Sequence, residues 1–176
     1  MASIFGHALA SIAIGSSFPK TLKSIRFWLL GMFCAIFPDI DVVGFKFSVK
    51  YASFFGHRGF THSFVFALVL GFVIALIFYR KKKNFIWYAL FFVLATVSHS
   101  VLDAMTTGGL GVAFFSPFDN ERYFFPWRPI QVSPIGAAKF FSSWGLQVLK
   151  SELLWIGLPS LLVILVFKTI NTIFRK

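Results

Sequence analysis

Long apolar runs alternate with short polar or basic connectors along the whole chain. The runs cover residues 3–18, 27–43, 60–79, 85–105 and 153–174. A bilayer-spanning helix needs about 20 predominantly apolar residues, and the third run meets that length. The first run is shorter and rich in small residues, which let helix backbones approach closely in lipid, so we expect it inside the bundle. The pattern predicts an all-α, polytopic transmembrane helical bundle of about five spans.

The segment between the last two runs, residues 106–152, is rich in glycine, proline and aromatic residues. A structureless loop of that length is uncommon in a compact domain. Its second half, Ile135–Lys150, places apolar residues on one helical stripe, which predicts an interfacial helix or lid lying on the membrane. The stripe consists of Ala137, Phe140, Phe141, Trp144, Val148 and Leu149.

The composition supports a membrane protein. Of the 176 residues, 57% are hydrophobic and only 13% are charged. Soluble domains are about 45–50% apolar and about 25% charged, so a soluble chain of this length could not bury so much apolar surface. The mean hydropathy is +0.79. We expect residues 1–176 to form a single membrane-embedded domain.

The net charge of +11 comes from basic clusters at the ends of the apolar runs. This placement indicates membrane topology and contact with anionic headgroups, not nucleic-acid binding. With five spans, the clusters at Lys20–Arg26, Arg80–Lys83 and Arg175–Lys176 fall on one side. The positive-inside rule makes that side cytoplasmic, with the N-terminus outside and the C-terminus inside.

The histidines and three aspartates fall at the other, outer ends of the predicted helices. Ionisable groups at membrane depth are costly and usually mark function, and several carboxylates in one place repel each other unless a cation compensates. His/Asp ligation suits zinc first, with manganese or iron as alternatives, and the number of ligands allows one or two ions. Hydrogen-bonded His–Asp pairs between packed helices would also explain the individual residues. The candidate ligands are His7, Asp39, Asp41, His57, His62, His99 and Asp103.

The stretches of sequence around most of these candidate ligands resemble the YdjM-like family of membrane-bound, metal-dependent hydrolases. Some members of that family are described as induced in the SOS response. The matching stretches are FPDID at 37–41, HRGFTHS at 57–63 and HSVLDAMTT at 99–107, and a fourth spans residues 116–130. The resemblance covers most of the chain. It implies the same bundle, a metal centre, and a place in the bacterial inner (cytoplasmic) membrane.

The leading functional prediction is a metal-dependent hydrolase acting on an ester or phosphoester of a lipid or lipid-linked phosphate at the outer face. The expected catalytic residues are Arg58, as a phosphate contact, and Asp39 or His57, as proton carriers. An i,i+4 relation between Arg58 and His62 would follow if the third helix began near Arg58. Arg122 and Arg128 could contact either phosphate or lipid headgroups, and Glu152 is expected to be a charge at a helix start.

The alternative functional class is a metal-ion transporter or a metal-binding membrane regulator without catalysis. A transporter needs ligands or a polar path through the whole membrane, and the inner halves of these helices are almost purely apolar. A purely structural metal in a partner protein is a third reading. The sequence leaves the oligomeric state open.

Overall fold

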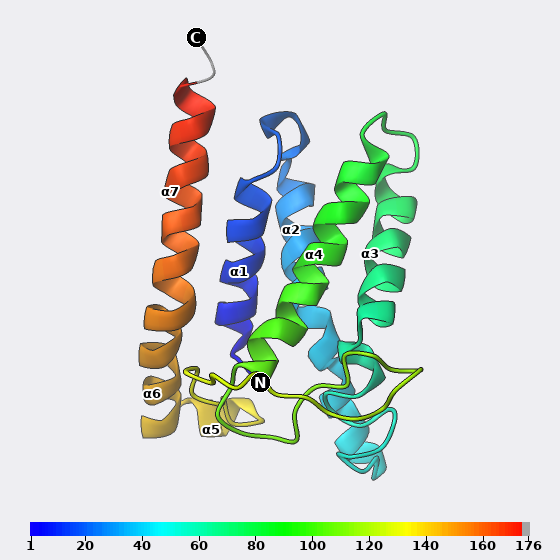
Figure 1. Cartoon of the computed structure of the whole chain (residues 1–176), viewed down its shortest axis with the longest axis vertical. Helices are drawn as coiled ribbons and strands as arrows, with labels where there is room; N and C mark the ends of the chain where they lie inside the picture. Colours follow the sequence, from blue (N-terminus) through cyan, green and yellow to red (C-terminus); the bar gives the residue numbers. More distant parts are fainter. Residues whose placement is uncertain (174–176) are drawn as a thin grey trace.

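The computed structural model describes residues 1–173, and within them the protein is all-helical (Figure 1). Two isolated bridges are the only β-type pairing in this part of the chain. The long helices are α1 (Ile4–Ser16), α2 (Ile25–Ile36), α3 (Phe64–Tyr79), α4 (Phe85–Ala104) and α7 (Leu158–Ile173). They run alternately up and down, as Figure 1 shows, which confirms the predicted all-α bundle.

Shorter helical segments join the long helices. They are η1 (Lys20–Leu22), η2 (Phe37–Phe47), η3 (Phe60–His62), α5 (Ala137–Phe140), α6 (Ser143–Glu152) and the π-helical η4 (Leu153–Gly157). Pro38 stands at the start of η2, where the chain changes from α-helical to 3-10 geometry. A proline inside a helix removes a backbone donor and crowds the preceding turn, so a change of geometry is expected here.

Serine caps fix where two helices begin at the end of the bundle that holds the histidines. Ser3 Oγ accepts from the backbone N–H of Gly6 at 3.3 Å, and Ser63 Oγ accepts from that of Phe66 at 3.0 Å. Such caps satisfy backbone N–H groups that a helix start leaves without partners. They place His7 in the first turn of α1 and His62 directly before α3.

The far half of the bundle is a tightly packed aromatic core. Phe27 and Phe91 stack at a centroid distance of 4.0 Å, and Tyr79 stacks on Tyr88 at 3.8 Å. Gly71 lets α3 approach α4 closely, because a Cβ there would lie 2.5 Å from the backbone nitrogen of Val93. This close contact between small residues and backbone is a common way for helices to associate in lipid.

Three stretches in the described part of the chain are long and apolar enough to span a membrane: Ile25–Phe47, Phe85–Ala104 and Ser143–Ile173. Helices α1 and α3 are apolar but shorter. Large apolar side chains point outward along the bundle, with Leu68 57% exposed on α3 and Leu162 64% exposed on α7. This surface is suited to lipid and supports the membrane assignment.

The predicted single interfacial helix over Ile135–Lys150 is wrong in its extent. The chain breaks between α5 and α6, where Ser142 is fully extended (φ −142°, ψ 179°). After the break, α6 runs through η4 into α7 without interruption, so its residues belong to the long final helix (Figure 1). Only the short α5 and its flanking loop lie across the end of the bundle.

The connectors that carry Lys20–Arg26 and Arg80–Lys83 lie together at one end of the bundle (Figure 1). The long segment between α4 and α5 lies at the opposite end, beside the N-terminus. The third basic cluster, Arg175–Lys176, lies outside the described residues.

Candidate metal centre

All seven candidate ligands gather at the end of the bundle away from the two described basic connectors. Their side chains come from the first turn of α1, from η2, from the segment that precedes α3, and from the last turns of α4. All four histidines and Asp103 are fully or almost fully buried, and Asp41 is 8% exposed. The seven residues are His7, Asp39, Asp41, His57, His62, His99 and Asp103.

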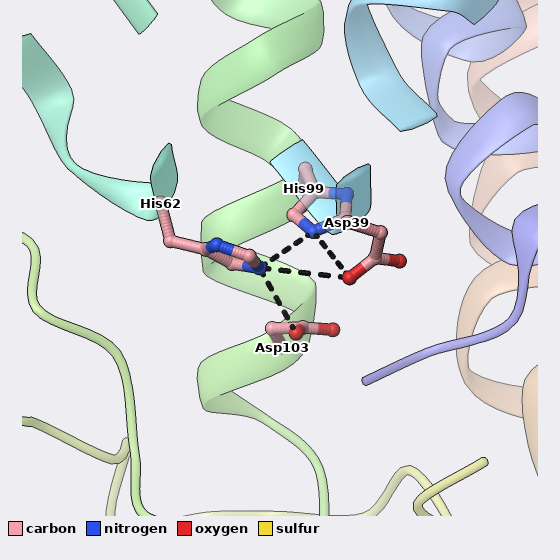
Figure 2. Close-up of side chains that lie close together, drawn as sticks. All are labelled: Asp39, His62, His99 and Asp103. Carbon is pink, nitrogen blue, oxygen red and sulfur yellow. Dashed lines mark hydrogen bonds and ion pairs between the residues drawn. The ribbon is translucent and has the colours of Figure 1, made fainter. Parts of the chain in front are cut away.

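Four of them face a common point, as Figure 2 shows. His62 Nε2 lies 2.9 Å from His99 Nε2 and 3.6 Å from Asp103 Oδ2. Asp39 Oδ1 lies 3.5 Å from His99 Nε2 and 3.7 Å from His62 Nε2. His99 and Asp103 share a face of α4 because they are four residues apart.

The neighbours of the two central histidines fix which ring nitrogen faces the cluster. His99 Nδ1 lies 2.7 Å from the carbonyl oxygen of Ala35, which can only accept, so Nδ1 carries the proton. His62 Nδ1 lies 3.1 Å from Thr61 Oγ1 and 3.2 Å from Asp41 Oδ2. Because the Thr61 hydroxyl donates to Asp41, both oxygens can only accept from His62, so its Nδ1 carries the proton. Each ring then presents the Nε2 lone pair to the other, which is the tautomer that binds a metal through Nε2 while Nδ1–H donates to a neighbour.

The spacing of these atoms fits a metal ion. Ligands at about 2.0–2.1 Å from a tetrahedral zinc ion lie about 3.3 Å from one another, close to the distances within this cluster. Both carboxylate oxygens of Asp39 are buried and have no hydrogen-bond partner. Buried charged oxygens without partners are expensive, and a cation would satisfy them. Two nitrogen and two oxygen donors suit zinc, manganese or iron.

His7 lies at the edge of the cluster. Its ring stacks on His99 at a centroid distance of 3.8 Å, and its Nε2 is 3.5 Å from Asp103 Oδ1. Neither ring nitrogen of His7 has a hydrogen-bond partner. His7 is therefore positioned either as an additional ligand or as a partner of Asp103.

A second group contains Asp41, His57 and His62. Asp41 Oδ1 is 2.7 Å from His57 Nδ1, while Asp41 Oδ2 accepts a hydrogen bond from Thr61 Oγ1 at 2.6 Å. His62 faces this group with Nδ1 and the first group with Nε2, so Asp41 orients His62. Burial lowers the pKa of His57, although the carboxylate of Asp41 opposes the shift. Its Nε2 is buried and has no hydrogen-bond partner.

Arg58 is fully buried and turned inward. Its Nε donates to Asp103 Oδ2 at 3.0 Å, and its two terminal nitrogens donate to Thr106 Oγ1 and the carbonyl oxygen of Gly108, both at 2.8 Å. Arg58 has a left-handed backbone (φ 62°), and α3 begins only at Phe64. The third helix therefore does not begin near Arg58, so Arg58 and His62 do not share a helical face. Arg58 contacts the cluster through Asp103 instead.

Residues 1–173 match the family described as YdjM inner membrane protein. The chain belongs to this family. It is 39% identical over 166 residues to the Escherichia coli (strain K12) protein named Inner membrane protein YbcI, covering 93% of this chain and 95% of that one. It is also 34% identical over 87 residues to the Bacillus subtilis (strain 168) protein named Uncharacterized protein YvsG, covering 46% and 51% of the two chains. No solved structure matches it.

In this YdjM-family protein, the other two candidate arginines lie outside the cluster. Arg122 donates to the carbonyl oxygens of His57, at 2.6 Å, and Tyr51, at 2.9 Å, and so fastens the loop that carries His57. Partial burial lowers its pKa. Arg128 lies over the ring of Phe124 at 4.6 Å. Arg122 is thus a structural clamp for the site, whereas Arg128 makes a cation–π contact.

Sequence reasoning missed several polar groups that support the cluster. Glu152, expected as a helix-start charge, is only 5% exposed and accepts hydrogen bonds from the backbone and hydroxyl of Ser3. It thereby joins the end of α6 to the start of α1. Thr61 holds Asp41, and the backbone N–H of Ala2 donates to Asp103 Oδ1 at 2.7 Å. The adjacency of Thr61 to His62 was the one signal in the sequence.

Proposed function

We propose that this protein is a membrane-bound, metal-dependent hydrolase that cleaves an ester or phosphoester bond of a lipid or lipid-linked substrate. One observation carries the proposal: two imidazoles and two carboxylates converge in a buried cluster in which both oxygens of Asp39 lack a partner. A divalent ion, when bound, supplies a Lewis acid that acidifies water and polarises the oxygen of the scissile group.

The protein residues would divide the remaining work. His62, His99, Asp39 and Asp103 are the proposed ligands, with zinc as the first expectation and manganese or iron as alternatives. Because His62 belongs to both groups and faces the first with Nε2, the arrangement favours one ion over two. Arg58 positions Asp103 by donating to its Oδ2. The phosphate contact expected from the sequence stays a prediction.

His57 is the proposed proton carrier. Its Nδ1–H donates to Asp41, which would stabilise the imidazolium, and its free Nε2 is left to accept a proton from water or return one to a leaving group. Its ring borders a cavity of about 290 Å³. Asp39 is the alternative proton carrier, provided that one of its two carboxylate oxygens does not bind the ion.

The competing function, transport of a metal ion, needs a polar route through the bundle. The buried charged groups of the described residues gather at one end, whereas the other half holds the aromatic core around Phe27, Phe91 and Tyr88. This distribution favours a site that opens on one face. By the positive-inside rule, we place that face outward in the inner membrane, with the N-terminus outside and the C-terminus in the cytoplasm.

The test is turnover by the purified protein, reconstituted with zinc, manganese or iron in vesicles of total bacterial lipid. New products are sought by mass spectrometry. We expect a lipid-derived product that is lost in His62→Ala and Asp39→Asn and kept in Asp119→Asn, a change in a loop outside the cluster. A metal-loaded protein that releases no product from any lipid class contradicts the proposal. That result favours a metal-binding membrane regulator without catalysis.

A further inference from the structure

An apolar groove leads from the outside of the bundle to the candidate metal centre. Its volume is about 430 Å³, within the range of about 300–1,000 Å³ that is common for ligand sites. The last turns of α2 and the start of η2 form much of its wall, and Asp39 contributes the one charged side chain to its lining. Its lining includes Phe33, Ile36, Phe37, Asp39 and Ile40.

The walls of the groove face the surroundings of the bundle. Phe33 is 43% exposed and Ile40 is 52% exposed, while the side chain of Asp39 is only 9% exposed. The groove is thus open at an apolar side and ends at a buried carboxylate without hydrogen-bond partners. In a membrane protein, the molecules that border such an opening are acyl chains.

A second cavity approaches the same centre with different chemistry. It has a volume of about 290 Å³, and its lining includes Tyr51, His57, Lys139 and Trp144 and no acidic side chain. Lys139 is exposed. A positively charged group in the same cavity as the proposed proton carrier suits an anionic headgroup. Met1 and Ile135 line both cavities, so the two cavities are neighbours.

We propose that the groove is the acyl-chain subsite for a membrane phospholipid, whose headgroup lies at the metal centre and faces the cavity of His57 and Lys139. This inference rests on the proposed function and adds the class of substrate and its orientation to it. The chain would lie along Phe33, Ile36 and Phe37 and bring its ester or phosphoester end to Asp39. Soluble phosphate esters could use only the second cavity.

Photolabelling tests the groove without turnover. The full-length protein in nanodiscs receives a phosphatidylglycerol that carries a diazirine in one acyl chain, and labelled peptides are mapped by mass spectrometry. The label is expected in residues 25–47, both before and after chelation of metal. Ile40→Trp should fill the groove and lower this labelling by about tenfold, the scale for losing the contacts of about two methylene groups.

Two matched controls separate the groove from general lipid contact. Val43→Trp changes a side chain that is 48% exposed in the same segment but does not line the groove, and it should keep the wild-type labelling. Phe33→Ala should lower labelling, whereas Leu29→Ala, one turn earlier on α2, should not. Exposed sites of this kind tolerate substitution, so the folded protein is retained.

Equal labelling of Ile40→Trp and Val43→Trp, or a label spread evenly over all lipid-facing helices, overturns the acyl-chain subsite. Metal content and any turnover of soluble esters would then stay intact, so the proposed hydrolase would survive that result. A protein that labels in the groove but never binds metal would instead overturn the hydrolase and leave a lipid-binding protein. The two failures are therefore distinguishable.

Discussion

The Nε2 atoms of His62 and His99 lie 2.9 Å apart in a position closed to solvent. The Nδ1–H of His62 faces Thr61 Oγ1 and Asp41 Oδ2, and the Nδ1–H of His99 donates to the carbonyl oxygen of Ala35. Two lone pairs cannot face each other at this distance without a cation or a shared proton between them. The arrangement therefore predicts that a metal ion binds between these two nitrogens.

We expect about one equivalent of a divalent transition metal per chain, held by the cluster of Asp39, His62, His99 and Asp103. His62→Ala and His99→Ala should abolish it, since each removes a nitrogen donor. His57→Ala should retain it, because His57 faces Asp41 and the second cavity. Elemental analysis after dialysis measures all four proteins. Retention of metal by folded His62→Ala would contradict the assignment, and two equivalents in the wild type would revive the two-ion arrangement.

Arg58→Lys should weaken metal binding by about 10- to 100-fold, the usual effect of losing a group that orients a ligand. Lysine keeps the positive charge but cannot make the three separate donations to Asp103, Thr106 and Gly108. Competition with a fluorescent chelator measures the affinity. Arg122→Lys is the control, because Arg122 holds the backbone of the His57 loop and contacts none of the four proposed ligands. If Arg58→Lys loses phosphoester turnover but keeps its affinity for metal, the result would instead support the phosphate contact expected from the sequence.

Gly109→Ala should destabilise the fold and disturb Arg58. Gly109 has a left-handed backbone (φ +94°), and an added Cβ would lie 2.7 Å from an Arg58 Nη and 2.8 Å from the Tyr51 hydroxyl. Strain of this kind costs about 1–3 kcal/mol. Gly136→Ala is the matched control, because its φ is +102° but nothing lies within 4 Å of the added atom. Thermal unfolding in detergent should show a larger decrease in unfolding temperature for Gly109→Ala than for Gly136→Ala. Equal decreases would mean that the left-handed backbone alone, and not the contact with Arg58, causes the destabilisation.

Reporter fusions test the orientation. The connectors with Lys20–Arg26 and Arg80–Lys83 lie at one end of the bundle, and the positive-inside rule makes that end cytoplasmic. Fusions at Lys82 and after Lys176 should both report the cytoplasm, and one within residues 106–135 should report the other side. A periplasmic signal at Lys82 would invert the protein and place the metal centre inside.

The periodicity and the charge pattern were enough to predict the bundle and to place the seven His and Asp residues at one end of it. Helix length and the alternating direction of successive helices determine which helix ends lie on the same side of the membrane. Their individual roles needed coordinates. The sequence could not show that Arg58 adopts a left-handed backbone and turns inward, since that depends on Asp103, Thr106 and Gly108, all far along the chain.

The predicted lid over Ile135–Lys150 was wrong in its extent for a similar reason. Its apolar stripe is compatible with one amphipathic helix, but a single extended residue, Ser142, divides it. The second piece continues into α7 as one helical stretch, Ser143–Ile173. Glu152 was misread because its partner, Ser3, is at the other end of the chain, and a long-range hydrogen bond leaves no trace in local spacing.

We expect the unequal lengths of the helices to affect the thickness of the surrounding bilayer. At about 1.5 Å per residue, the 13 residues of α1 and the 16 of α3 extend only about 20 and 24 Å, against a hydrocarbon core of about 30 Å. Such a mismatch is relieved when the lipids thin locally, at a modest cost per ångström. Headgroups beside α1 and α3 would then sink toward the buried histidines. The protein should consequently unfold at a higher temperature in short-chain bilayers than in long-chain ones, which reconstitution in lipids of graded acyl length can measure.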